Sequence, residues 1–267
     1  MFEHIVLGAI QGVTEWVPIS SKACVIAAKV HLFKNTGSLN ELINYALLLH
    51  LGTFFAAVIY FWADIKAIFA SAFHPEETNT DGRKILVFLT ITTILTALGQ
   101  LIINKVDALA YSAPQVKVLI TLLIASLLIV AGILQLKTNA TGKRTPKDLT
   151  PLDGVLLGLT QAIATLPGLS RAGTTMAILS LRNFDKENML KLSFLMSLPV
   201  ILIGNIIKNY KVFTSFGAEW MGVLTAFVVG IFSINALMAF ARKVNFGAFL
   251  IFIGTILATA VLLGFID

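Results

Sequence analysis

Six long apolar stretches, separated by short polar segments, occupy most of this chain. They lie at about 42–63, 84–104, 115–136, 187–208, 218–240 and 245–265. A helix needs roughly 20 consecutive apolar residues to cross the hydrocarbon core of a bilayer, and each stretch meets that length. The segments between them, at 64–83, 105–114 and 137–151, are predicted loops. The pattern therefore predicts six transmembrane helices.

Two further regions, 1–40 and 152–186, are apolar but interrupted near their middle. In each, Pro, Ser and other polar residues separate two apolar halves. Neither half is long enough to span a bilayer. Non-helical backbone at membrane depth is tolerated only inside protein or beside a water-filled cavity. We therefore predict that each region forms a re-entrant helical hairpin.

The same order of elements, one hairpin followed by three spans, occurs twice. A single membrane domain, 1–267, would contain a first repeat (1–136), a cytoplasmic linker (137–150) and a second repeat (151–267). Because three spans are an odd number, the second repeat must be inserted upside down relative to the first. The predicted fold is an all-α integral membrane protein with six transmembrane helices and two re-entrant helical hairpins, arranged as inverted-topology repeats.

The distribution of Lys and Arg predicts how these repeats are oriented. The segments 64–84 and 137–150 together hold seven Lys or Arg, whereas 105–117 holds only Lys105 and Lys117. Cytoplasmic loops carry the excess of cations, so the first two segments are predicted to be cytoplasmic. The first hairpin then enters the plasma or inner membrane from outside and the second from the cytoplasm. A site built on the first hairpin would face the outside.

The composition supports a membrane protein and limits its partners. Of the 267 residues, 57% are hydrophobic and 13% are charged, and the mean hydropathy is +0.87. Soluble domains carry about 25% charged residues. The net charge of +6 arises mostly in loops, where membrane lipids, not nucleic acid, are the expected partners. A homodimer is plausible, although no span carries a convincing stripe of small residues to pack it.

Two short polar segments stand out within the predicted hairpins. They run from Gln11 to Cys24 and from Gln161 to Gly173, and each places Gln, Pro, Ser, a cation and a small residue in the same order. Carboxylates, hydroxyls and guanidinium groups at membrane depth are costly and are usually functional. We therefore take the two segments as the candidate site.

Glu15 is the acidic residue of the first segment, and we expect it to be a metal ligand or a general base. A buried carboxylate needs a cation as its partner; the alternative is a side chain that extends to the lipid headgroups. Gln11 lies one helical turn earlier on the same face. Its amide would bind the same ion or phosphate, or would bond to a neighbouring helix. Gln161 stands at the matching place in the second segment.

Two hydroxyl groups, those of Ser20 and Ser21, follow Pro18. One of them is expected to be the N-cap of the second half of the hairpin. A serine at a helix N-terminus also lies where backbone N–H groups and the helix dipole favour a phosphate. Ser21 would become a nucleophile if a base took its proton.

Arg171 is the stronger of two candidate phosphate-binding cations. Arginine forms bidentate contacts with phosphate, and neighbouring glycines let the backbone approach a ligand closely; the alternative is an Arg171 that only pairs with Glu15. Lys22 follows the serines of the first segment, where a ligand role and contact with the headgroups both stay open. The other expected phosphate-binding residues are Ser20, Gly168, Ser170, Gly173 and Thr174.

His50 and Cys24 are expected to support the site. His50 lies in the middle of a predicted span, where a hydrogen bond between helices is the favoured role. Cys24 would be a nucleophile only as a thiolate, and its apolar neighbours disfavour that form. As the single cysteine of the chain, it also excludes an internal disulfide and a cysteine zinc site.

On these motifs, the chain resembles the bacitracin-resistance family of undecaprenyl-diphosphate phosphatases. The first motif of that family matches Gln11 to Ser21, and the second matches Pro167 to Thr175; weaker matches are His50 to Thr53 and Ser193 to Pro199. The resemblance covers essentially the whole chain. It implies a membrane enzyme that removes the terminal phosphate of a C55 polyprenyl diphosphate, so that this carrier of cell-wall glycans is reused. It also implies a divalent metal, Mg²⁺ or Ca²⁺.

The resemblance implies roles for the matching residues. Glu15 would be the essential carboxylate, Ser21 a proposed nucleophile, and Ser170 and Arg171 the pair that holds phosphate. Gln11 stands where family members carry Glu or Gln, and it would share a metal with Glu15. Immediately after the serine pair the chain departs from the family. Where members usually carry a small residue, Gly and His, it has Lys22-Ala23-Cys24.

A metal-dependent polyprenyl-diphosphate phosphatase is the leading hypothesis. Its rival is a polyprenyl-phosphate flippase that performs no hydrolysis, which the opposed hairpins and the loss of the motif His favour. Release of phosphate from the lipid separates the two.

Overall fold

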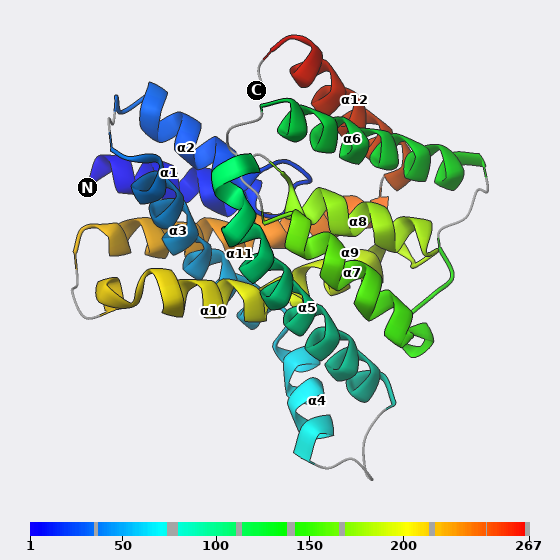
Figure 1. Cartoon of the computed structure of the whole chain (residues 1–267). Coiled ribbons are helices and arrows are strands. Elements are labelled where there is room, and N and C mark those ends of the chain that lie inside the picture. The colour runs from blue at the N-terminus through cyan, green and yellow to red at the C-terminus, as the bar shows by residue number, and fades with distance from the viewer. Residues whose placement is uncertain are drawn as a thin grey trace.

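Helices make up the described structure. The computed structural model describes residues 1–34, 37–73, 80–110, 114–137, 142–165, 169–213, 217–243 and 245–264. Within these ranges the regular elements are twelve α-helices and two short 3-10 helices, η1 (Pro146–Asp148) and η2 (Tyr210–Phe213). Figure 1 shows their arrangement. The prediction of an all-α fold is confirmed.

Both predicted hairpin regions are pairs of short helices with matching lengths. The first helix pair is α1 (Phe2–Thr14) and α2 (Ser21–His31), and the second is α7 (Pro151–Ile163) and α8 (Arg171–Leu181). In each pair the first helix has 13 residues and the second has 11. The two polar segments of the sequence thus connect the members of two similar units.

The second helix of each pair begins with a serine N-cap. The Ser20 hydroxyl accepts a hydrogen bond from the Ala23 N–H, and the Ser170 hydroxyl accepts one from the Gly173 N–H. A serine in this position stabilises a helix by about 1 kcal/mol because it satisfies a donor that has no partner within the helix. These caps fix where α2 and α8 start.

Within the described residues, four stretches are long and apolar enough to cross a membrane. They are α3 (Leu39–Tyr60), residues 81–103 of α5 (Thr80–Ala110), residues 186–208 and α11 (Glu219–Lys243). The other two predicted spans are also helices, α6 (Pro114–Lys137) and α12 (Phe246–Leu262). Their described apolar parts are shorter, at 121–133 and 247–262.

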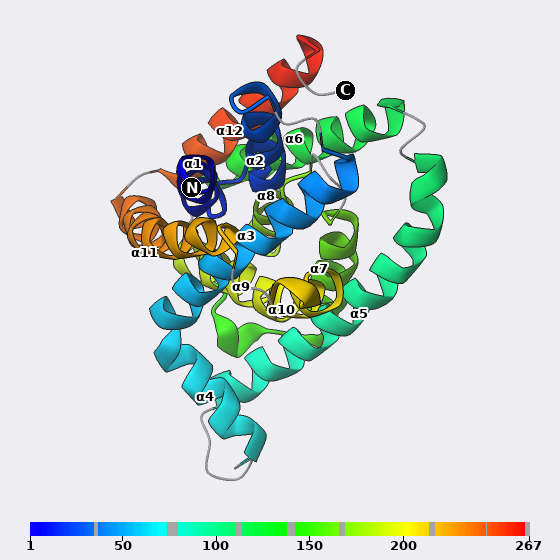
Figure 2. The ribbon, with the colours of Figure 1, turned by 90° about the vertical axis from the view of Figure 1, so that its left-hand side faces the viewer.

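Two details differ from the expected elements. The span at 187–208 is broken into α9 (Lys186–Leu195) and α10 (Ser197–Lys208), because Pro199 has no N–H to donate to the carbonyl four residues earlier. The predicted loop at 64–83 contains a helix, α4 (Trp62–Phe73). It buries Ile68 and Ser71 against its neighbours, and it projects with the start of α5 from the rest of the bundle (Figures 1 and 2).

Each helix pair packs on a helix of the other half of the chain. Helix α1 lies along α11, and α7 lies along α5. Small residues permit both contacts: a Cβ added at Gly8 would collide with the carbonyl oxygen of Gly222, and one added at Gly158 would lie 2.9 Å from Leu95 Cβ. Close backbone approach through glycine is typical of membrane helices. The two halves are therefore interlocked.

A tryptophan anchors the connection between α1 and α2. The Trp16 indole N–H donates to Gly230 O at 3.1 Å and to Ser233 Oγ at 3.0 Å. Its ring packs edge-on against Phe194, with the centroids 5.1 Å apart. The polar connection of the first helix pair is thereby held between α11 and α9, deep in the protein.

Candidate active site

The inner ends of the two helix pairs meet at a cavity of about 90 Å³. Its polar lining includes Glu15, Ser21, Lys22, His50, Gln161 and Arg171. Pockets for drug-sized ligands are roughly 300–1,000 Å³, so this cavity suits a phosphate-sized group. It brings together groups from both polar segments of the sequence.

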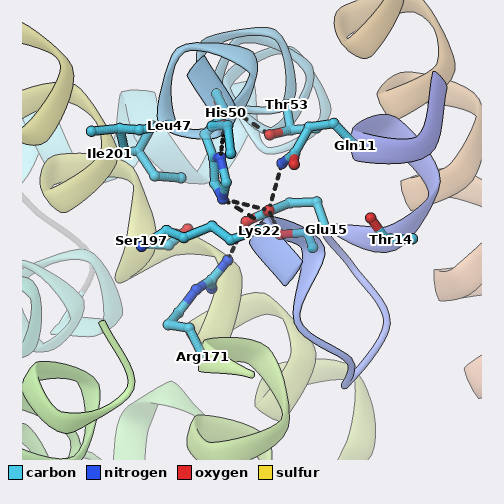
Figure 3. A network of polar contacts seen from close by, with 12 residues as sticks. Gln11, Thr14, Glu15, Lys22, Leu47, His50, Thr53, Arg171, Ser197 and Ile201 are labelled. Carbon is cyan, nitrogen blue, oxygen red and sulfur yellow. Dashed lines mark hydrogen bonds and ion pairs between the residues drawn. The ribbon is translucent and has the colours of Figure 1, made fainter. Parts of the chain in front are cut away.

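Glu15 lies at the centre of the polar network drawn in Figure 3. Its side chain is buried, with 5% exposure. One carboxylate oxygen, Oε1, accepts a hydrogen bond from the Arg171 guanidinium at 2.6 Å. The other, Oε2, accepts from Gln11 Nε2 at 2.8 Å and from Ser21 Oγ at 2.9 Å. The buried charge therefore has the cation that such a group requires.

His50 completes this network from α3. Its Nε2 lies 3.2 Å from Glu15 Oε2 and 3.4 Å from Ser21 Oγ. Its Nδ1 lies 2.7 Å from Ala46 O. Because a carbonyl oxygen only accepts, Nδ1 carries a hydrogen and Nε2 is the ring nitrogen that faces the carboxylate and the hydroxyl. The His50 ring thus links α3 to Glu15 and Ser21 of the first helix pair, which are candidate catalytic residues.

Two cations reach the cavity from the two helix pairs. Arg171 binds Glu15 through one terminal nitrogen and donates to Ser193 O through the other, at 2.8 Å. The pairing of Arg171 with Glu15, one of the expected alternatives, is thus present. Lys22 donates to Thr165 O at 3.3 Å, across the interface between the two helix pairs. Lys22 thus lines the cavity.

Ser20 and Ser21 have different contacts: one caps a helix and the other bonds to the carboxylate. Ser20 caps α2, whereas Ser21 is buried and donates to Glu15. Ser170 caps α8, and its carbonyl accepts from the Thr174 hydroxyl at 2.6 Å. Gly173 lies against Pro18, so its missing side chain lets the two connections approach each other.

Some expected phosphate-binding residues lie beside the cavity and not on its wall. Among the residues that the structure describes, the lining includes Ser20 and Lys22 but not Ser170, Gly173 or Thr174. Gly168 falls outside the described residues. The expected set is therefore only partly assembled around this cavity.

The remaining supporting residues separate into two kinds. Gln11 bonds to Glu15, and Gln161 Nε2 donates to Thr96 Oγ1 at 3.1 Å and to Met196 O at 3.3 Å. In both glutamines the amide oxygen is buried and has no hydrogen-bond partner in the described part of the chain. Cys24 is a half-buried free thiol outside the cavity lining.

The donor set does not fit a metal held by the protein alone. Glu15 is the one carboxylate among the lining residues that the structure describes, and its oxygens already contact four groups, Arg171 among them. No group of three His, Cys, Asp or Glu suited to a metal occurs in the described ranges. Mg²⁺ and Ca²⁺ require several oxygen ligands, usually carboxylates.

The helix caps correct how the two polar segments correspond. The sequence order matched Lys22 with Arg171. The caps Ser20 and Ser170 are 150 positions apart, as are Gln11 and Gln161, so Arg171 corresponds to Ser21. The prolines, Pro18 and Pro167, are only 149 positions apart, and counting from them gave the match of Lys22 with Arg171.

Comparison with known proteins identifies the family of the chain. The family model "Bacitracin resistance protein BacA" matches residues 4–260. A protein of Methanococcoides burtonii named undecaprenyl-diphosphatase is 34% identical over 265 residues, 95% of this chain and 96% of its own. Proteins with that name from Moorella thermoacetica (32% over 262 residues, 95% and 93%) and Haloarcula marismortui (33% over 251 residues, 91% and 91%) are similar. This chain belongs to the bacitracin resistance protein BacA family.

Proposed function

We propose that this protein is a membrane phosphatase that hydrolyses undecaprenyl diphosphate, or a similar polyprenyl diphosphate, to the monophosphate. Such a reaction recycles the lipid carrier used in cell-wall glycan synthesis. The observation that carries the proposal is the Ser21 hydroxyl, 2.9 Å from the Glu15 carboxylate in a cavity lined by two cations. The name shared by the relatives supports the choice of substrate.

Ser21 would act as the nucleophile. Its Oγ forms a bond to the terminal phosphorus, the bond from that phosphorus to the bridging oxygen breaks, and prenyl monophosphate leaves with the electron pair. The Ser21 proton passes to the pair formed by Glu15 and His50, whose nearest atoms lie 2.9 and 3.4 Å from Oγ. The departing prenyl monophosphate takes that proton from the pair. Water then attacks the phosphoserine, the bond from Ser21 Oγ to phosphorus breaks, and the pair takes a proton from the water and returns it to Oγ.

Arg171 would neutralise the charge of the transferring phosphoryl group. Arginine has five N–H donors, and the two bonds to Glu15 and Ser193 leave others for phosphate oxygens. The N-termini of α2 and α8 add backbone donors on the same cavity. Phosphoryl transfer depends mainly on such positioning and charge neutralisation.

The isoprenoid chain would leave the cavity along its apolar wall. Leu47 of α3 and Val200 and Ile201 of α10 supply that wall. The cavity itself is too small for a long hydrocarbon chain, so only the diphosphate would enter it. The lining comes from one chain, so the proposed reaction needs no second copy even if the protein forms homodimers.

A divalent metal, Mg²⁺ or Ca²⁺, would reach this site only when it is already bound to the diphosphate. The donor set argues against a resident ion, as described above. Gln11, which shares the carboxylate of Glu15, has a buried amide oxygen with no partner in the described residues. Gln11 is not among the described lining residues, so it would orient the Glu15 carboxylate toward such a metal and would not itself be the first ligand.

Two inverted repeats in the plasma membrane are the topology that best accommodates this site. Ion pairs at two ends of the molecule support it. Glu3 pairs with Lys29 at the end of the first helix pair that is remote from the cavity. Arg144 and Arg182 pair with Asp153 at the end of the second helix pair that is remote from the cavity. Figure 1 shows the starts of α1 and α7 on opposite sides. With the basic linker in the cytoplasm, the first helix pair enters from outside.

Phosphate release by the purified protein in detergent tests this function. Undecaprenyl and farnesyl diphosphates serve as substrates, with Glu15→Ala and Arg171→Ala beside the wild type. Glu187→Ala is the matched control, because Glu187 forms an exposed ion pair with Arg242. Release that both site variants abolish supports the phosphatase. Lipid binding without release by the wild type refutes it and favours the flippase.

A further inference from the structure

The cavity carries one more positive group than negative. Lys22 and Arg171 are cations of its wall, and Glu15 is the one carboxylate among the described lining residues. Arg171 forms an ion pair with Glu15. Lys22 has a backbone carbonyl, Thr165 O, as its hydrogen-bond partner. An ammonium group at membrane depth is costly without a counter-charge, so this site is built for an anion.

Both cations stand at the N-termini of helices. Lys22 is the second residue of α2, and Arg171 is the first residue of α8. The positive end of a helix dipole disfavours a cation in its first turn. The same position favours a bound phosphate. Two helix N-termini and two cations on one cavity therefore suit a ligand with two adjacent anionic groups, as a diphosphate has.

The two cations serve different parts of that ligand. Arg171 belongs to the network of Glu15, Ser21 and His50, where the terminal phosphorus would react. Lys22 reaches instead to Thr165 in the second helix pair, and Figure 3 shows it extending away from Gln11. The phosphate that carries the prenyl group would lie at Lys22. That phosphate is the leaving group.

We propose that Lys22 supplies, within this chain, the charge that a divalent cation would otherwise supply to the diphosphate. The inference rests on the proposed function and deepens it. When the bond between the terminal phosphorus and the bridging oxygen breaks, negative charge accumulates on the prenyl monophosphate. The Lys22 ammonium neutralises that charge as a compact point charge, and no proton needs to move there. Hydrolysis by this chain is then largely independent of Mg²⁺ and Ca²⁺.

Two observations agree with this assignment. The lining residues do not provide a ligand set for a metal, since Glu15 is already bound by Arg171. Among the cations that the structure describes in the lining, Lys22 is also the one that forms no ion pair with Glu15. The chain thus combines an additional cation with a poor metal site.

The test compares phosphate release in a chelator and in Mg²⁺, for the full-length protein in detergent with farnesyl diphosphate. The rate of phosphate release by the wild type in the chelator should be within about threefold of its rate in Mg²⁺, because the Lys22 ammonium neutralises the leaving phosphate. Lys22→Thr should lose about a hundredfold in the chelator, the cost of one donor at a developing charge. Mg²⁺ should restore most of that loss. Lys29→Thr, on the same helix but paired with Glu3, should behave as the wild type.

A binding measurement complements the kinetics. In the chelator, a non-hydrolysable farnesyl methylenediphosphonate should raise the unfolding temperature of the wild type and should fail to raise that of Lys22→Thr. Equal unfolding temperatures without ligand confirm that the variant is folded. Wild-type activity that needs Mg²⁺ overturns the inference and leaves the proposed function standing. No release in either condition overturns the proposed function, and this inference with it.

Discussion

Ser21 and Arg171 occupy the same position in two matched helices and bind the two oxygens of one carboxylate. Each is the first residue after a serine N-cap. Ser21 donates to Glu15 Oε2 at 2.9 Å, and Arg171 donates to Glu15 Oε1 at 2.6 Å. One half of the chain thus supplies the proposed nucleophile where the other supplies a cation. The carboxylate holds both side chains beside the same cavity.

Replacement of Glu15 by glutamine should abolish the proposed reaction. Glutamine keeps the size of the side chain but neither accepts the Ser21 proton nor pairs with the charge of Arg171. Phosphate release should fall by roughly a hundredfold or more, the usual contribution of a general base. Glu3→Gln, which removes the ion pair with Lys29 far from the cavity, should leave the rate unchanged. A Glu15→Gln enzyme within a few fold of the wild type would contradict the role of the carboxylate.

His50, and not Cys24, should carry the acid–base function of the site. His50→Gln keeps a donor for Ala46 O but removes the basic nitrogen near Ser21. The rate of phosphate release should drop by about a hundredfold. Cys24→Ala is the control, because the thiol does not line the cavity. A large loss in Cys24→Ala with an unaffected His50→Gln would reverse the assignment.

The contact between α1 and α11 should be sensitive to a single methyl group. Gly8→Ala places a Cβ against the carbonyl oxygen of Gly222, which should lower the free energy of unfolding by about 1–3 kcal/mol through overpacking. Gly204→Ala meets only Leu47 atoms at 3.7 Å and should be neutral or stabilising. Thermal unfolding in detergent measures both. Equal unfolding temperatures for the two variants would mean that α1 and α11 separate easily.

Asp153 should be the most important acidic residue for stability outside the cavity. It is fully buried and bonds to Arg144 and Arg182, each at 2.7 Å. Asp153→Asn leaves two guanidinium groups without their counter-charge, at a cost of about 3–5 kcal/mol. The nearby Asp148, which is exposed on η1, is the matched control. Thermal unfolding of Asp148→Asn should resemble that of the wild type, and an equally mild Asp153→Asn would refute the importance of this cluster.

Cysteine labelling in intact cells tests the orientation. In a Cys24→Ala background, a cysteine at Thr145 should react only with reagents that reach the cytoplasm. A cysteine at Leu32, which is 66% exposed at the end of α2, should react with a membrane-impermeant reagent added outside. Labelling of position 145 from outside alone would refute the proposed topology.

The sequence predicted the helix pairs well because their limits depend on local chemistry. Serine caps, proline and the lengths of apolar runs determine where α2 and α8 begin, and these features are visible in the chain. The helix α4 was missed because charged residues, Asp64 and Lys66, interrupt its apolar residues. Its stability comes from packing on α5, which no local pattern records.

Contacts between distant helices were harder to predict. The membership of His50 in the site depends on how α3 packs against the first helix pair, and periodicity does not reveal the neighbours of a buried face. The match of Lys22 with Arg171 failed by one position because Pro18 and Pro167 are 149 positions apart, whereas the serine caps are 150 apart. The acceptor for Arg171, Ser193 O, is a backbone atom and has no side-chain signal. Only the weak family match at Ser193 to Pro199 pointed to that region.

The interlocking of α1 with α11 also governs how the protein is made. Domains normally fold from the N-terminus as they are synthesised. Here Glu15 enters the membrane 156 residues before its partner Arg171 is translated, and the surface on which α1 packs comes later still. Until then, the newly made first helix pair holds a carboxylate without its cation. A ribosome that stops before α11 therefore releases a chain that has the described lining residues of the cavity but lacks the helix on which α1 packs.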